Sequence, residues 1–139
     1  MAKQTNLYIT KAIKNISQSI ANADNLAMKV LFTAGVDDSV VKSLMCASDE
    51  TVSRNVALWL NDGASDRLLG TVNVPLNAGF NGTVPTVDLL AGLLLPGLPF
   101  DQNGKRVLPM QAGYILKASV TVQVTAAKTM HISGVAEDY

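Results

Sequence analysis

The sequence predicts an all-β domain built as a sandwich or a barrel, and three observations lead to this prediction. From residue 26 onward, apolar residues recur with a period of two, as they do along half-buried strands. The segments with this alternation are short and evenly spaced, which is typical of sandwiches and barrels. Turn sequences rich in Asn, Asp and Gly separate them, for example at 61–63, 81–82 and 103–104.

The clearest predicted strand spans Tyr114–Val124. Its alternate residues Leu116, Ala118 and Val120 are apolar and share one face, which Val122 and Val124 continue, while Lys117 and the other intervening polar residues share the opposite face. This pattern is typical of an antiparallel sheet with one face in solvent. Further strands are predicted at Met28–Ala34, Val40–Ala47, Arg54–Asn61, Arg67–Leu76, Arg106–Met110 and Lys128–Ala136.

Residues 1–25 have a different pattern and are predicted to form an N-terminal arm or helix, next to a single β-domain over residues 26–139. Ile9, Ile13, Ile16 and Ile20 are spaced by four, three and four residues, which predicts an apolar stripe on a helix. β-branched residues also suit strands, so an extended arm is the alternative. The stripe could pack on its own domain or dock on a neighbouring subunit.

Within Arg54–Asn61 the alternation places Val56 and Leu58 inward and Trp59 outward. An outward tryptophan is unusual unless something covers it, so Trp59 is a candidate contact residue.

A second break in the pattern is the apolar run from Val87 to Phe100, which contains two prolines and two glycines. Thr86 or Asp88 could cap a short helix that Pro96-Gly97 would end. The leucines of this run either plug one end of the sandwich or form a contact surface for another subunit. The candidate contact residues here are Leu93, Leu94, Leu95, Leu98 and Phe100.

Composition excludes several classes of function. The chain has 139 residues with 11 basic and 11 acidic side chains, so no basic excess is available to neutralise nucleic-acid phosphates. No apolar run reaches 18 residues, so no membrane-spanning helix is expected. The first six residues do not resemble a signal peptide, and the single cysteine cannot form an internal disulfide, so synthesis in the cytoplasm is expected. Charged residues make up only 16% of the chain, which indicates that a partner covers part of the surface.

No arrangement of residues predicts catalysis, a cofactor or a metal site, so the protein is expected not to be an enzyme. His131 and Cys46 are the only histidine and cysteine, and nothing in the sequence brings them together. The acidic loops at 62–66 and 101–104 lack the ligand spacing of a calcium loop, and their Asp and Asn residues are better interpreted as turn formers.

Several stretches of the chain resemble small virion proteins of tailed bacteriophages, and the resemblance covers roughly residues 28–139. The stretches that carry it are 56–63, 69–75, 87–90, 94–99, 101–104, 109–118 and 124–129. They are similar to capsid decoration, or cement, proteins of the Bordetella phage type. The resemblance implies an antiparallel, jelly-roll-like β-sandwich that binds the capsid exterior of the virion. It also implies two partners, the major capsid protein and further copies of the chain itself, in a homodimer or a trimer.

The mechanism implied by the resemblance is a clamp on neighbouring major capsid subunits that stabilises the expanded shell. The residues expected to contact partners are Ile9, Ile13, Ile16, Ile20, Trp59, Leu93, Leu94, Leu95, Leu98 and Phe100. Two alternatives stay open, since a fold does not define a function. One is a neck, tail or fibre component. The other is a host-surface carbohydrate-binding module, which the aromatic content of 5% disfavours.

Overall fold

The computed structural model describes residues 12–93 and 97–139, and nearly all of its regular structure is β. A 3-10 turn at Asn22–Asp24 follows the first strand, and a one-turn helix, α1, spans Leu89–Gly92. The strands are β1 (Ala12–Ala21), β2 (Lys29–Thr33), β3 (Ser39–Ser48), β4 (Arg54–Asn61), β5 (Asp66–Val74), β6 (Val87–Asp88), β7 (Leu108–Met110), β8 (Ile115–Val120) and β9 (Thr129–Asp138).

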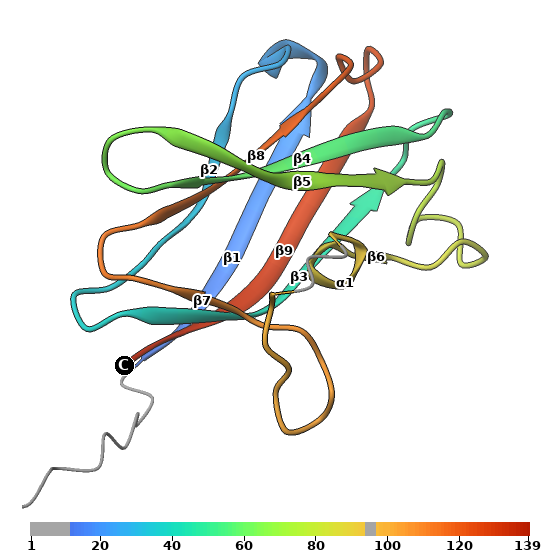
Figure 1. The fold of residues 1–139 in the computed structure, drawn as a ribbon. Helices are drawn as coiled ribbons and strands as arrows, with labels where there is room; N and C mark the ends of the chain where they lie inside the picture. Colours follow the sequence, from blue (N-terminus) through green and yellow to red (C-terminus); the bar gives the residue numbers. More distant parts are fainter. Residues whose placement is uncertain (1–11, 94–96) are drawn as a thin grey trace, which may run out of the picture.

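The strands form two antiparallel sheets that pack face to face (Figure 1). Sheet A has the order β1-β9-β3-β6, and β7 also pairs with β3. Sheet B has the order β2-β8-β4-β5. The prediction of an all-β sandwich is therefore confirmed.

The pairing order is nested along the chain. At the centre β4 pairs with β5, β3 then pairs with β6 and β7, β2 pairs with β8, and β1 pairs with β9. The chain thus behaves as one long antiparallel ribbon, folded so that successive pairs fall alternately in sheet B and sheet A. This wrapping is the jelly-roll arrangement of two packed sheets.

The helical prediction for the N-terminal segment is wrong for its described part, because residues 12–21 form strand β1. All ten residues of β1 pair with β9, from Ala12 opposite Asp138 to Ala21 opposite Thr129. Ile16 and Ile20 are four residues apart, and an even spacing places two side chains on the same face of a strand as well. Both are buried, whereas Ile13 falls on the other face and is 69% exposed. Residues 12–21 are therefore part of the sandwich.

The core lies between the sheets and follows the alternation of the strands. In β8 the inward residues Leu116, Ala118 and Val120 are buried, and in β4 so are Val56 and Leu58. The strand predicted to reach Val124 ends at Val120, because the chain leaves the sheet there. Val122 is consequently 56% exposed instead of facing inward, although Val124 is buried in the connecting loop.

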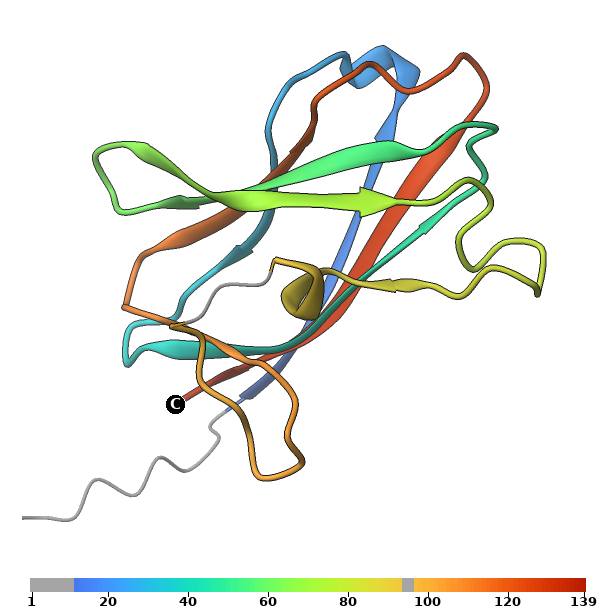
Figure 2. The same cartoon turned by 45° about the vertical axis from the view of Figure 1, so that its right-hand side comes forward.

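The short helix α1 closes one side of the sandwich, next to β3 and β5 (Figure 2). Asp88 begins it, because its Oδ1 accepts hydrogen bonds from the backbone N–H groups of Leu90 and Ala91 at 3.0 and 3.1 Å. Leu89 and Leu90 are buried in the same core cluster as the strands. The leucines of this helix therefore act as a plug, one of the two roles that the sequence allowed.

A buried glutamate ties together three loops at one end of the sandwich. Glu50, in the β3–β4 loop, is fully buried. Its Oε2 accepts a hydrogen bond from Arg54 Nε at 2.6 Å, and its Oε1 accepts one from the backbone N–H of Thr125 in the β8–β9 loop at 3.1 Å. Its carbonyl oxygen accepts from the N–H of Asn77 in the β5–β6 loop at 3.1 Å. One side chain and its own backbone thus hold three connections in register.

Candidate functional site

Four of the seven described residues that were expected to contact partners pack in or against the chain's own core. Ile16, Ile20 and Leu93 are 2%, 0% and 8% exposed, and Leu98 is partly buried against the core. The expectation that Ile16, Ile20 and Leu93 bind a partner is corrected, because these side chains are packed inside the subunit, whereas Leu98 keeps part of its surface accessible. Ile9, Leu94 and Leu95 lie outside the described residues.

Three other expected contact residues also keep accessible surface. Ile13 on β1 is 69% exposed and Phe100, in the loop before β7, is 61% exposed. Trp59 on β4 is half-buried. These residues lie on different parts of the molecule, so the structure does not bring them together into one site.

Trp59 faces outward on sheet B, as its place in the alternation predicts. Its indole Nε1 donates a hydrogen bond to Ser119 Oγ on the neighbouring strand β8 at 3.0 Å. Ala57 and Ser119 pair across β4 and β8 on this same outer face, yet they are only 4% and 6% exposed. The indole therefore lies over this part of the sheet and shields it from solvent.

A row of side chains with Trp59 near its middle crosses all four strands of sheet B. Val30 on β2 is opposite Lys117 on β8, Lys117 is opposite Trp59, and Trp59 is opposite Leu68 on β5. Val30 and Leu68 are 49% and 54% exposed. We call these four residues the sheet B row. It gives the outer surface of sheet B an apolar band, with one cation placed inside it.

The sequence analysis missed Val30 and Leu68. The register between β4 and β5 shifts between Leu58 and Trp59, which places Leu68 beside Trp59 on the outer face. The available signal was the pair Leu68-Leu69, because two adjacent leucines in a strand cannot both face the core. Val30 precedes a similar register shift in the pairing of β2 with β8.

Lys117, the cation of the sheet B row, forms an ion pair with Asp66 at the end of the same sheet. Lys117 Nζ lies 3.1 Å from Asp66 Oδ1, and the Lys117 side chain is only 20% exposed. The pKa of Asp66 is lowered, first by the hydrogen bond from the Asn61 side chain and then by Lys117. Because the charge has a partner beside it, Lys117 contributes mainly its aliphatic stem to the exposed band.

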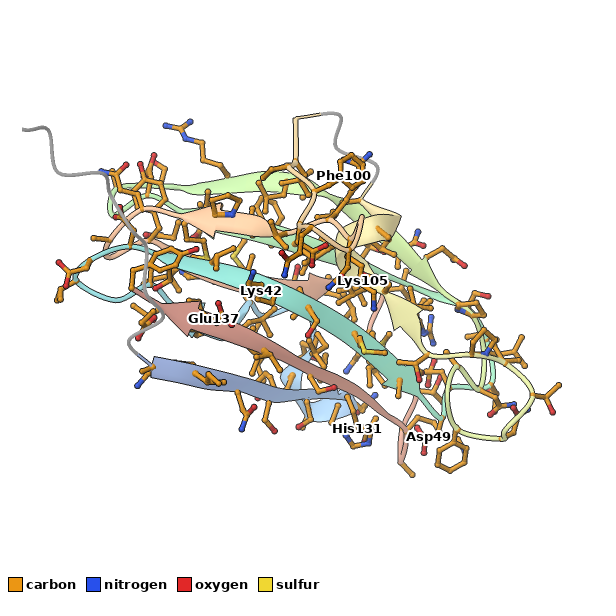
Figure 3. All side chains as sticks on the ribbon, turned by 90° about the horizontal axis from the view of Figure 1, so that it is seen from below. Lys42, Asp49, Phe100, Lys105, His131 and Glu137 are labelled. Atoms are coloured by element: carbon orange, nitrogen blue, oxygen red, sulfur yellow. The ribbon has the colours of Figure 1, made fainter. Side chains whose placement is uncertain are left out.

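The outer face of sheet A is chemically different. Ser17 on β1 is opposite Ser133 on β9, and Ser19 is opposite His131. These side chains line a shallow hollow on the surface, and Figure 3 shows His131 at this face. Around this hollow the outer face of sheet A is small and polar, although Ile13 and Met45, which are 69% and 41% exposed, lie on the same face.

The surroundings of Cys46, Asp62 and Asp101 indicate structural roles for these side chains. Cys46 is fully buried in β3, and this burial raises the pKa of its thiol to about 12. Asp62 Oδ1 accepts the backbone N–H groups of Ala64 and Ser65, and Asp101 Oδ1 accepts those of Asn103 and Lys105. These contacts confirm the interpretation of both aspartates as turn formers. Across residues 12–93 and 97–139, no group of three His, Cys, Asp or Glu side chains is placed to hold a metal ion.

No protein-family model matches this chain, and neither does any curated protein or any solved structure. None of the helices in the described part of the chain has the length and apolar character needed to cross a membrane.

Proposed function

We propose that this chain is a non-enzymatic structural protein of a phage virion. In this proposal it binds the outer surface of the capsid, clamps neighbouring major capsid subunits and stabilises the expanded shell. The observation that carries the proposal is the sheet B row, with Val30 and Leu68 half exposed on either side of Trp59. Aromatic and apolar anchors of this kind dominate the binding energy of protein interfaces.

The resemblance to phage decoration proteins adds support from the same part of the molecule. Two of the stretches that carry it, 56–63 and 69–75, run along β4 and β5. These are the strands that present Trp59 and Leu68. A jelly-roll sandwich also leaves a broad outer sheet face available to a partner, although the fold by itself defines no function.

The energetics suit a weak contact that is repeated many times. Fully burying a Val or Leu side chain stabilises by roughly 1.5–3 kcal/mol, so covering the exposed half of Val30 and of Leu68 would contribute about 1 kcal/mol each. A protein that binds only the expanded shell stabilises it by mass action, by about 2.7 kcal/mol per site at a free concentration one hundred times the Kd. If two copies associate, the second capsid contact becomes intramolecular and the affinity of the pair rises further.

The contact surface is tested by cosedimentation of the purified chain with expanded capsids that lack it, taken from the phage that encodes it. Leu68→Glu places a charge in the sheet B row and should lower the affinity at least tenfold. Leu76→Glu is the matched control, because Leu76 is 45% exposed but lies beyond the end of β5. Equal binding by both variants would exclude the sheet B row as the contact.

The place of the protein in the particle is tested by its copy number in purified virions, measured by quantitative mass spectrometry against the major capsid protein. Hundreds of copies in a simple ratio to that protein are expected for a decoration protein. A dozen copies or fewer would contradict the proposal and identify a neck, tail or fibre component. Absence from virions, together with glycan binding, would instead indicate a carbohydrate-binding module.

A further inference from the structure

A second exposed anchor lies in the loop between α1 and β7, whose residues 97–107 we call the Phe100 loop. The loop projects below the sandwich in Figures 1 and 2, whereas β4 and β5 lie above. Asp101 organises it, because Asp101 Oδ1 accepts the backbone N–H groups of Asn103 and Lys105 at 2.8 and 2.9 Å. The N–H of Asp101 in turn donates to the carbonyl oxygen of Lys105 at 2.8 Å. The loop is thus a hydrogen-bonded projection with a defined shape.

Phe100 is held in an exposed position by this loop. It forms an isolated β-bridge with Arg106, and the guanidinium carbon of Arg106 lies 4.6 Å from the centre of the phenyl ring. Arg106 Nη1 also donates to the carbonyl oxygen of Leu98 at 3.3 Å, which fixes the guanidinium beside the ring. The ring nevertheless stays 61% exposed. Phe100 would therefore lose little side-chain entropy when a partner binds it.

Basic side chains gather at the Phe100 loop. Figure 3 shows Lys42 of β3 and Lys105 of the loop on the same side of the molecule as Phe100. Together with Arg106 they give three cations, and the acidic groups beside them are Asp101 and Glu137. Asp101 accepts backbone N–H groups in the turn and keeps its negative charge, and Lys42 Nζ lies 4.0 Å from Glu137 Oε2, which is a long and weak ion pair. The three cations therefore exceed the two acidic groups by one charge. The pKa of Asp101 is lowered, first by the Lys105 backbone hydrogen bond, with Lys42 and Lys105 adding their charge.

Phe80 provides an internal comparison. It lies in the β5–β6 loop and is 66% exposed, about as much as Phe100. Among the described residues, however, Phe100 is the aromatic ring that has a cation stacked on it. Exposure alone therefore does not distinguish the two phenylalanines, whereas their electrostatic surroundings do.

We propose that Phe100 inserts into an apolar pocket of a capsid subunit and that carboxylates at the rim of this pocket face Lys42, Lys105 and Arg106. The inference rests on the proposed function and names the chemistry of a second contact. Because the Phe100 loop and the sheet B row lie on different sides of the sandwich, one copy of the chain could contact two neighbouring subunits. Two separate contacts are what a clamp requires.

The test uses the same expanded capsids without the decoration protein, and it measures the affinity of variants of the full chain. Phe100→Ala should weaken binding at least tenfold, while Phe80→Ala should bind within twofold of the wild type. Phe100→Leu, which keeps an apolar group of similar size, should restore most of the affinity. Because both phenylalanines are exposed, thermal unfolding should show that neither alanine variant loses the fold.

The charge requirement is tested separately. Lys105→Glu should weaken binding at least tenfold and Lys105→Arg should not, and the affinity of the wild type should fall as salt is raised from 50 to 500 mM. A DNA oligonucleotide is added as competitor. If the oligonucleotide displaces the chain from capsids, the basic loop binds nucleic acid and the proposal is overturned.

The outcomes separate this inference from the proposed function. If the wild type binds capsids and Leu68→Glu weakens binding, but Phe100→Ala binds like Phe80→Ala, the Phe100 contact is refuted and the proposed function stands. If the wild type does not bind capsids at all, both are refuted.

Discussion

The buried Glu50 allows the sharpest test of what holds this sandwich together. Replacing it by Gln keeps the size of the side chain but removes the charge that faces Arg54. The 2.6 Å hydrogen bond from Arg54 Nε to Glu50 Oε2 is charge-assisted and short. The new amide oxygen can still accept the N–H of Thr125, so the loss falls on the Oε2 side, where Arg54 Nε and Thr125 Oγ1 both donate to the carboxylate. Hydrogen bonds to charged groups contribute about 1.5–3 kcal/mol, and we expect a loss of stability in this range.

Urea denaturation of the purified chain measures this loss directly, and thermal unfolding should show a decrease in Tm of about 5–10 °C for a chain of this size. Glu137→Gln is the matched control. Glu137 is the chain's other glutamate, its side chain is 25% exposed, and it lies 4.0 Å from Lys42. Its replacement should cost less than about 1 kcal/mol. A Glu50→Gln variant within about 0.5 kcal/mol of the wild type would refute the reasoning.

A double-mutant cycle would locate the effect. Arg54→Met leaves the carboxylate of Glu50 buried without its cation, which should cost about 3–5 kcal/mol. The double variant Glu50→Gln/Arg54→Met removes both charges and should be more stable than the sum of the single losses predicts. Additive losses would mean that Glu50 and Arg54 act independently, in contradiction to the geometry.

Three further predictions follow from burial and charge. Ile16→Ala should destabilise the chain by about 2–5 kcal/mol, while Ile13→Ala should change its stability by less than about 0.5 kcal/mol, and equal losses in urea denaturation would contradict the strand register of β1. Cys46 should resist alkylation at pH 8 in the folded chain and react within minutes in urea, since burial raises its pKa to about 12; rapid labelling of the native chain, followed by mass spectrometry, would show that the thiol is accessible. The pKa of Asp24 is lowered from 3.8, first by the Ala21 N–H and then by Lys29, so its stabilising contribution is complete above pH 3.8 and is lost as the pH falls through the lowered pKa. Asp24→Asn should therefore make stability less dependent on pH below 4, and an unchanged pH profile would contradict this assignment.

The strands could be predicted where one residue pattern allowed a single structure. The alternation of Leu116, Ala118 and Val120 fits a strand alone, and β8 is found there. The isoleucine spacing of β1 led to the wrong prediction of a helix, because a spacing of four residues fits both a helix and a strand. Only the pairing with β9 decides between them, and β9 lies more than a hundred residues away in the sequence.

The candidate surface could be predicted only in part. Trp59 was expected to face outward, and the register confirms this because it pairs with Lys117 on the outer face. Its neighbour Leu68 depends on a register shift between β4 and β5, which a sequence pattern does not reveal. Leu93 was ambiguous because an apolar run between prolines can fill a core or cover a surface, and only the position of α1 shows that it fills the core.

The nested pairing of the strands sets the order in which this chain can fold. β1 has β9 as its only partner strand within the described sheets, so it has no sheet to join until the last strand has been synthesised. β9 also lies between β1 and β3, which means that sheet A stays divided until then. On a ribosome, the hairpin of β4 and β5 can form early, but the sandwich closes only after the end of β9 has emerged. Loss of β9 by truncation would therefore leave two unpaired strand edges and an open core, rather than a slightly smaller domain.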